Sequence, residues 1–167
     1  MAESKKGRIQ IKIGKGRFFS LLTAVFTFVL MFFNWFKVEA LGESISFSIF
    51  HSDMFDLDTC LGIAKVFAII ALVVGILYII ALAINFEKLV PGLKKFKFGF
   101  NRLFGLVFYG LLCFALLFNI IGCIATDGVV PTVKIILIFI YVILLVVFFA
   151  IPAISRGLSK KFELVLE

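Results

Sequence analysis

The chain has 167 residues, of which 63% are hydrophobic, and its mean hydropathy is +1.19. Soluble domains contain about 45–50% apolar residues, so this composition excludes an ordinary soluble domain. The net charge of +7 is divided between separate segments and forms no single basic patch. We therefore expect no nucleic-acid partner, and we expect the lipid bilayer to be the main surroundings of the chain.

The chain begins with a basic arm, residues 1–17, which contains six Lys and Arg residues. Within it the segment "GRIQIKIGKGR" alternates apolar and polar residues, which is typical of an extended segment at a membrane surface. The arm suits two roles, binding to anionic lipid and marking the cytoplasmic side of the membrane. The second role is the simpler interpretation.

Four long apolar runs follow the arm. A helix that crosses a bilayer needs about 20 apolar residues, because each adds about 1.5 Å and the hydrocarbon core is about 30 Å thick. Barrel strands are about 10 residues long and alternate in polarity, which these runs do not. We predict an all-α fold, a four-helix transmembrane bundle forming one domain over 18–155, followed by a cytoplasmic tail, 156–167. The predicted helices cover residues 18–36, 62–86, 103–125 and 132–154.

Charge predicts the orientation of the bundle. Fourteen of the seventeen basic residues lie in the arm, the second connection and the tail, whereas the first and third connections and their flanks hold six of the ten acids. Basic loops stay in the cytoplasm, so both termini are predicted inside the cell, in a multi-pass protein of the plasma membrane. The small residues of "VEA" at 38–40 leave removal of residues 1–40 open, although the preceding run exceeds the length of about 7–15 that is typical of a signal peptide.

The first outer connection is the longest. "ISFSIF" (45–50) alternates apolar and polar residues, which predicts an ordered outer loop with β character. The pattern His-x-Asp-x-x-Asp-x-Asp follows, but without calcium-loop spacing, so we expect a solvated acidic loop and no metal. The candidates for interaction through this loop are His51, Asp53, Asp56 and Asp58. At the end of the first run, Trp35 is predicted to anchor the chain at the membrane interface.

Small residues at helical spacing in the second and third runs predict a close helix–helix contact at the centre of the bundle. Asn119 is strongly polar and lies well inside its run. Its simpler role is an interhelical hydrogen bond, and its alternative role is to line a polar path. The candidate packing residues are Ala64, Ala68, Ala71, Gly75, Gly105, Gly110 and Asn119.

No catalytic motif is present: the sequence lacks G-x-S-x-G, H-E-x-x-H, a phosphate loop and C-x-x-C. We therefore expect neither an enzyme nor a cofactor. Cys60 and Cys123 are expected at similar depth near the outer side, which leaves a disulfide between them open, while Cys113 should be a free thiol.

The layout resembles that of claudin-like proteins and of small four-span membrane proteins of bacteria. The shared features are inner termini, a long first outer loop with strand character and an aromatic exit from the first span at Trp35. The several Trp residues and the Cys pair of the claudin outer loop are absent. The resemblance therefore implies topology and no barrier function.

These observations predict a non-catalytic membrane scaffold or accessory subunit that binds another membrane or extracytoplasmic protein. The alternative is a homo-oligomeric pore or channel with Asn119 near its path. A carrier of lipid or a small solute is a third and weaker hypothesis.

Overall fold

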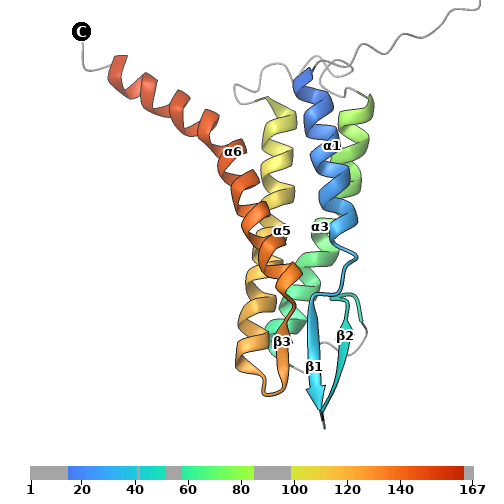
Figure 1. Ribbon diagram of the computed structural model, residues 1–167. Coiled ribbons are helices and arrows are strands. Elements are labelled where there is room, and N and C mark those ends of the chain that lie inside the picture. The colour runs from blue at the N-terminus through green and yellow to red at the C-terminus, as the bar shows by residue number, and fades with distance from the viewer. Residues whose placement is uncertain (1–14, 41, 52–57, 85–98, 164–167) are drawn as a thin grey trace, which may run out of the picture.

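The computed structural model describes residues 15–40, 42–51, 58–84 and 99–163, and within these it describes Lys15 and 152–163 as backbone only. Figure 1 shows the described helices running alongside one another, with a small sheet at the end opposite the C-terminus. The chain order is α1 (Lys15–Leu30), β1 (Phe36–Ala40), β2 (Glu43–Phe47), α3 (Thr59–Ile84), α5 (Phe100–Ala125), β3 (Val129–Pro131) and α6 (Val133–Glu163). The mostly helical fold and the strand character of the first outer connection are thus confirmed.

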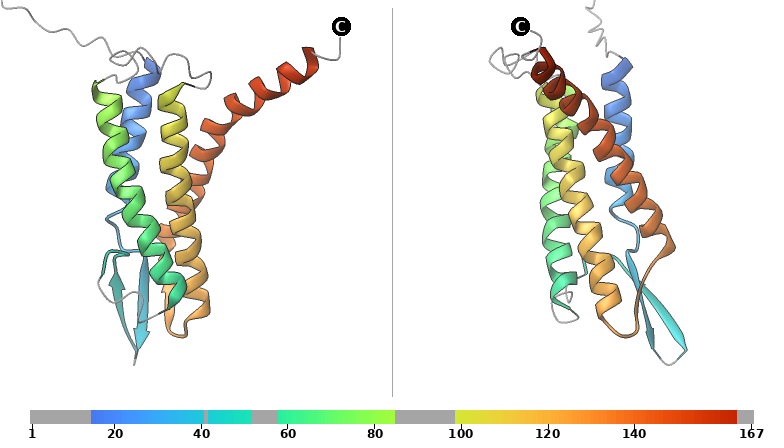
Figure 2. Two further views of the ribbon diagram at one scale, coloured as in Figure 1. Left: turned by 180° about the vertical axis from the view of Figure 1, so that it is seen from behind. Right: turned by 90° about the vertical axis from the view of Figure 1, so that its left-hand side faces the viewer.

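Three of the helices are long and apolar enough to cross a membrane: Thr59–Ile84, Phe100–Ala125 and the Val133–Ile151 part of α6. Their bounds agree with the predicted runs within a few residues. The helix α6 continues to Glu163, so the predicted tail begins as helix. In Figures 1 and 2 this last part of α6 turns away from the other helices.

The first predicted helix, 18–36, was wrong at its end. The helix α1 has 16 residues and ends at Leu30, six residues earlier than the apolar run suggested. The backbone N–H groups of Phe32 and Phe33 donate to carbonyls three residues back, so the helix tightens into a turn. The chain then enters β1 at Phe36. Apolarity alone does not distinguish a helix from a buried strand. Here Phe36, the last residue of the apolar run, begins the strand.

The helices α3 and α5 share the most extensive contact of any two elements. Small residues allow it: Ala64, Ala68 and Ala71 are completely buried. A Cβ added at Gly75 would lie 2.6 Å from Cε2 of Phe108, and one at Gly105 would lie 2.7 Å from the hydroxyl oxygen of Tyr78. The two backbones are therefore as close as their facing aromatic rings permit.

Gly110 is different from the other predicted packing residues. It is half-buried, and an added Cβ would meet nothing within 4 Å. The sequence spacing places small residues on a helix, but the rotation of α5 turns Gly110 away from α3. The expectation that Gly110 forms part of the close contact is therefore corrected.

Two matched substitutions test this packing. Gly75→Ala should lower the free energy of unfolding by about 1–3 kcal/mol, because the buried Phe108 ring must move. Gly110→Ala should be neutral or stabilising by up to about 1 kcal/mol, because alanine is the better helix former. Thermal unfolding of both variants in detergent measures the difference. Equal losses in the two variants would contradict the assigned rotation of α5.

Candidate interaction surface

The sheet at the end opposite the C-terminus has the strand order β2-β1-β3, so β1 is central. The strands β1 and β2 form an antiparallel hairpin in which Ala40 pairs with Glu43, leaving a two-residue turn that contains Gly42. Gly42 has φ 85°, a left-handed conformation that tight hairpin turns require and that glycine adopts without strain.

The strand β3 belongs to the second outer connection and pairs antiparallel with β1. At the start of this pairing, the N–H of Glu39 donates to the carbonyl of Gly128 at 2.7 Å. At its other end, the N–H of Thr132 donates to the carbonyl of Trp35 at 3.1 Å. The two outer connections, which are far apart in sequence, are thus joined into one sheet by backbone hydrogen bonds.

The two faces of the sheet differ in polarity. One face carries two apolar pairing rows, and its inner part packs into the core: Phe36 is completely buried and Val129 is 4% exposed. A third row on this face pairs Ala40 with Glu43. The same face ends at the outer strand with Ile45, which is 59% exposed. The opposite face carries Lys37, Glu39, Ser44 and Ser46. An apolar side chain thus extends beyond the area that the helices cover.

The strand β2 is the edge of the sheet, and no other strand among the described residues pairs with its outer side. Successive residues of a strand direct their backbone N–H and C=O groups to opposite sides. The N–H of Glu39 points to β3, so the backbone groups of its neighbours Val38 and Ala40 point to β2. The pairing register then directs the backbone N–H and C=O groups of Ser44 and Ser46 away from the sheet. Four residues of β2, Glu43 to Ser46, are exposed. The edge therefore offers free strand-pairing groups beside an exposed isoleucine.

Trp35 anchors the sheet to the helices. Its indole is 1% exposed, and its Nε1–H donates to the carbonyl of Met31 at 3.1 Å. Its backbone N–H donates to the carbonyl of Phe47 at 2.9 Å. The structure places this ring in the core at the junction of α1 and β1. Its predicted role as an anchor at the membrane interface stays a prediction. A large ring at the junction of α1 and β1 fixes where the helix stops.

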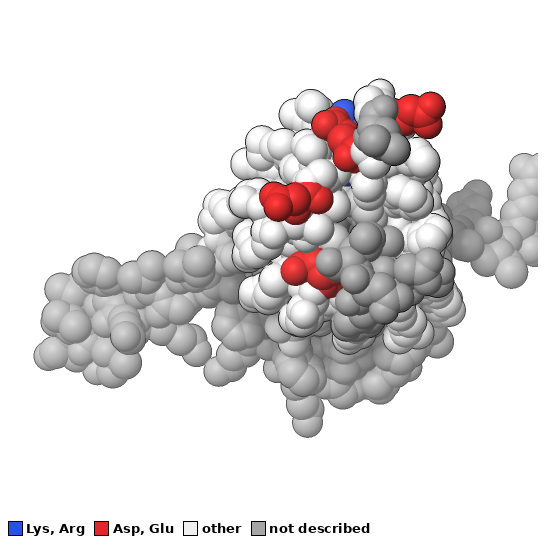
Figure 3. All heavy atoms as spheres, turned by 90° about the horizontal axis from the view of Figure 1, so that it is seen from below, with Lys and Arg blue, Asp and Glu red and all other residues white. Residues whose placement is uncertain are grey.

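The sheet end of the molecule is acidic. Seen from the sheet end, Figure 3 shows acidic side chains spread over this face and little basic surface. The exposed acids Glu39, Glu43 and Asp127 lie on the strands and the α5–β3 turn. The carboxylate of Glu39 lies 3.6 Å from the ammonium of Lys37, the one salt bridge found in the described part of the chain.

The predicted outer-loop residues have varied outcomes. Asp53 and Asp56 lie outside the described residues. Asp58 caps α3: its Oδ1 accepts hydrogen bonds from the N–H groups of Cys60 at 2.7 Å and Leu61 at 3.3 Å. The ring of His51 packs edge-on against Phe47, with centroids 5.2 Å apart, and its carbonyl accepts from Lys65 at 2.8 Å. Within the described ranges no group of three potential metal ligands is found.

Asn119 and the three cysteines do not belong to the strands of the sheet. Asn119 is completely buried in α5, and neither atom of its amide has a hydrogen-bond partner within the described structure. All three cysteines are free, with Cys123 buried and Cys60 and Cys113 half-buried. The structure thus contains no bridge between Cys60 and Cys123.

Sequence reasoning missed β1, β3 and the role of Gly128. The residues of β1 follow an apolar run without interruption, and β3 has only three residues. A signal was available in the glycine of "TDG", since a glycine between a helix and a short apolar segment often adopts positive φ. Comparisons with known protein families, curated proteins and solved structures found no match. The resemblance to claudin-like proteins therefore rests on topology alone.

Gly128 offers a direct test of the link between the outer connections. Its φ is 78°, and an added Cβ would lie 3.1 Å from the carbonyl oxygen of Glu39. Gly128→Ala should therefore lower stability by more than the roughly 1–2 kcal/mol that positive φ costs a residue with a side chain. Gly42→Ala is the control, because it has the same backbone strain but nothing within 4 Å.

Fluorescence of Trp35, the single Trp of the chain, follows unfolding close to this link. We expect a lower unfolding midpoint for Gly128→Ala than for Gly42→Ala. A Gly128→Ala protein as stable as the wild type would show that β3 does not pair with β1 as described.

Proposed function

We propose that the chain is a non-catalytic, multi-pass protein of the cell membrane that binds another protein through the outer edge of its sheet. Membrane insertion is supported by three helices of sufficient length and apolarity. The exposed side chains of α3 and α6 are apolar on most of their surface, as for Val73, Leu77 and Leu144, which are 51–63% exposed. Such a surface suits lipid and not water.

We include α1 as a fourth span, which completes a four-helix bundle. Its 16 residues rise about 24 Å, less than the hydrocarbon core of about 30 Å. The exposed rings of Phe32 and Phe33 continue the apolar surface beyond the helix end. The backbone N–H groups of this turn remain hydrogen-bonded within the chain, as lipid requires.

The orientation follows from charge. The sheet end is acidic, whereas the basic residues of the arm and the second connection flank the opposite helix ends. The positive-inside rule then puts the sheet outside the cell and both termini in the cytoplasm.

The observation that carries the proposal is the exposed edge of β2 with Ile45 beside it. Free edges attract other strands, and proteins that are not selected to bind usually protect them with charge, proline or a covering segment. Here the outward backbone groups belong to Ser44 and Ser46, which neither repel nor block a strand. A partner that adds an extended segment would gain backbone hydrogen bonds and cover Ile45.

The chemistry of the partner segment follows from the surroundings of the edge. Glu43 is exposed at one end of β2, and Glu39, which is also exposed, precedes its pairing partner Ala40 on β1. We expect the partner segment to alternate apolar and polar residues and to carry Lys or Arg near the hairpin turn. No site in the described structure favours catalysis over binding. The sequence also lacks the catalytic motifs considered above, which supports a non-catalytic role.

Labelling tests the orientation. In a background with all three native cysteines replaced by serine, Ser46→Cys should react with a membrane-impermeant maleimide in intact cells. Ser159→Cys should react only after the cells are opened, because α6 ends on the cytoplasmic side. The reverse pattern would overturn the proposed topology.

Proline substitution tests the edge. Ser46→Pro removes an outward N–H that the sheet does not use, so the fold should tolerate it. If a partner strand adds to β2, the substitution removes one or two backbone hydrogen bonds between them. The recovery of the co-purified partner should then fall about tenfold, the change in affinity that such a loss causes. Ser46→Ala keeps the N–H and serves as the control, with recovery equal to that of the wild type.

The outcomes separate the two candidate functions. A partner that binds Ser46→Pro as well as the wild type would exclude β2 as the binding edge. Ring-shaped oligomers of the purified chain that conduct ions in liposomes, with no co-purified protein, would support the homo-oligomeric pore instead.

A further inference from the structure

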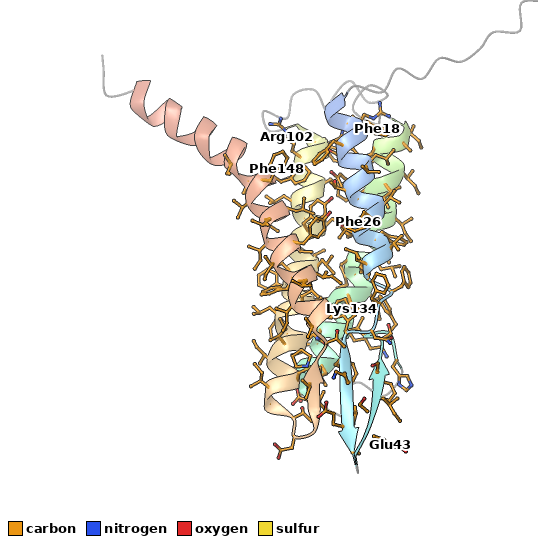
Figure 4. The ribbon with its side chains drawn as sticks, viewed as in Figure 1. Phe18, Phe26, Glu43, Arg102, Lys134 and Phe148 are labelled. Carbon is orange, nitrogen blue, oxygen red and sulfur yellow. The ribbon has the colours of Figure 1, made fainter. Side chains whose placement is uncertain are left out.

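The opposite end of the molecule contains a cavity of about 530 Å³ where the four helices approach one another. Every helix contributes to its lining: Arg17 and Ser20 of α1, Leu82 of α3, Arg102 of α5, and Phe148 and Ile151 of α6. The volume lies within the range of about 300–1,000 Å³ that is typical of small-molecule sites. Figure 4 shows Arg102 and Phe148 near one end of the molecule and Glu43, which belongs to the sheet, at the other end.

The cavity combines two cations with apolar walls. Arg17 donates from Nε to the carbonyl of Leu82 at 2.5 Å and from a terminal nitrogen to that of Ala83 at 2.8 Å. These bonds satisfy carbonyls at the last turn of α3 that have no partner within the helix. Arginine has five N–H donors, so part of the Arg17 guanidinium stays available. Arg102 is exposed, and no carboxylate in the described structure pairs with it.

The cavity faces the hydrocarbon through a sparse contact between α1 and α6. These two helices approach each other at few points, and their ring contacts include Phe19 with Phe148 at a centroid distance of 6.4 Å. Phe19, Phe148 and Ile151 remain 50–58% exposed. In Figure 1, α1 and α6 diverge towards this end. A ligand at this position would therefore meet apolar side chains on its membrane side and arginines at the helix ends.

We propose that this cavity binds one anionic phospholipid of the inner leaflet, with its phosphate on Arg102 and Arg17 and an acyl chain between α1 and α6. Charge complementarity selects the occupant. The guanidinium fork binds phosphate oxygens in pairs, and the arginines lie at the first turns of α1 and α5, the level of the headgroups in the proposed topology. The apolar rim accepts an acyl chain and disfavours a free anion. This inference rests on membrane insertion but not on binding at the outer sheet.

Native mass spectrometry of the detergent-purified chain tests this site with phosphatidylglycerol as the probe and phosphatidylcholine as the neutral comparison. Wild-type protein should retain phosphatidylglycerol about tenfold better than phosphatidylcholine. Arg102→Gln should lose about tenfold in phosphatidylglycerol binding, and Arg102→Lys, which keeps the charge but not the fork, should lose less. Lys134→Gln removes one charge at the sheet end and should bind within about twofold of wild type, because that residue is remote from the cavity.

A second pair of variants separates the cavity from a general attraction of basic residues for anionic lipid. Ser20→Phe fills the cavity without changing charge, and Gly16→Phe does so from the cavity rim, where an added Cβ meets nothing within 4 Å. Whichever of these two variants keeps the wild-type unfolding midpoint should lose phosphatidylglycerol binding about as strongly as Arg102→Gln does.

Three results would overturn the proposal. The first is equal loss in Arg102→Gln and Lys134→Gln, which would indicate only surface attraction. The second is unchanged binding in both cavity-filling variants. The third is displacement of the lipid by millimolar inorganic phosphate, which would identify an anion site without a lipid requirement.

Discussion

The sheet end of this protein depends on the central position of β1. A strand that is covered by other elements must satisfy its backbone groups on both sides, since an unpaired buried group is costly. Here β2 satisfies one side and β3 the other. This arrangement fixes the burial of Trp35 and Phe36 at the junction with α1. It also explains why α1 stops at Leu30, because the residues that would extend the helix are needed to begin the sheet.

The sheet in turn rests on the contact between α3 and α5. Near the outer end, an added Cβ at Gly122 would lie 2.8 Å from Cγ of Leu61, so the two helices are close there too. The strand β3 follows α5 after a short turn and keeps a contact with that helix. The sheet is consequently held against the packed helices. In the proposed function, a partner would meet a β2 strand that is already formed in the free protein.

Three of the four helices were predictable from the sequence, because about 20 apolar residues in a row have few alternatives. The alternation in "ISFSIF" correctly indicated a strand, although β2 begins at Glu43 and ends at Phe47. The strand β1 was hidden, since "FNWF" continues the apolar run of the first helix without interruption. The pairing of β1 with β3 joins residues about ninety positions apart, as in Val38 with Val129. No pattern within a short stretch of the sequence predicts such a contact.

The details of the sites were less predictable for the same reason. Spacing identified Gly75 and Gly110 equally, but helix rotation places only Gly75 against a ring. The cavity near Arg102 forms where helix ends meet, and the sequence reveals only that basic residues flank those ends. Trp35 shows the limit of composition: an aromatic residue beside an apolar run is typical of the membrane interface, but its burial between α1 and the sheet is seen only in the structure.

Hydrogen–deuterium exchange, read by mass spectrometry on the detergent-purified chain, tests the central place of β1 most directly. Both sides of β1 are hydrogen-bonded, so all amides of residues 37–40 should exchange slowly. In β2 the amides of Ser44 and Ser46 face outward and should exchange much faster than that of Ile45. Fast exchange throughout 37–40, with the helices still protected, would contradict the account, because the outer sheet would then not be a stable part of the fold.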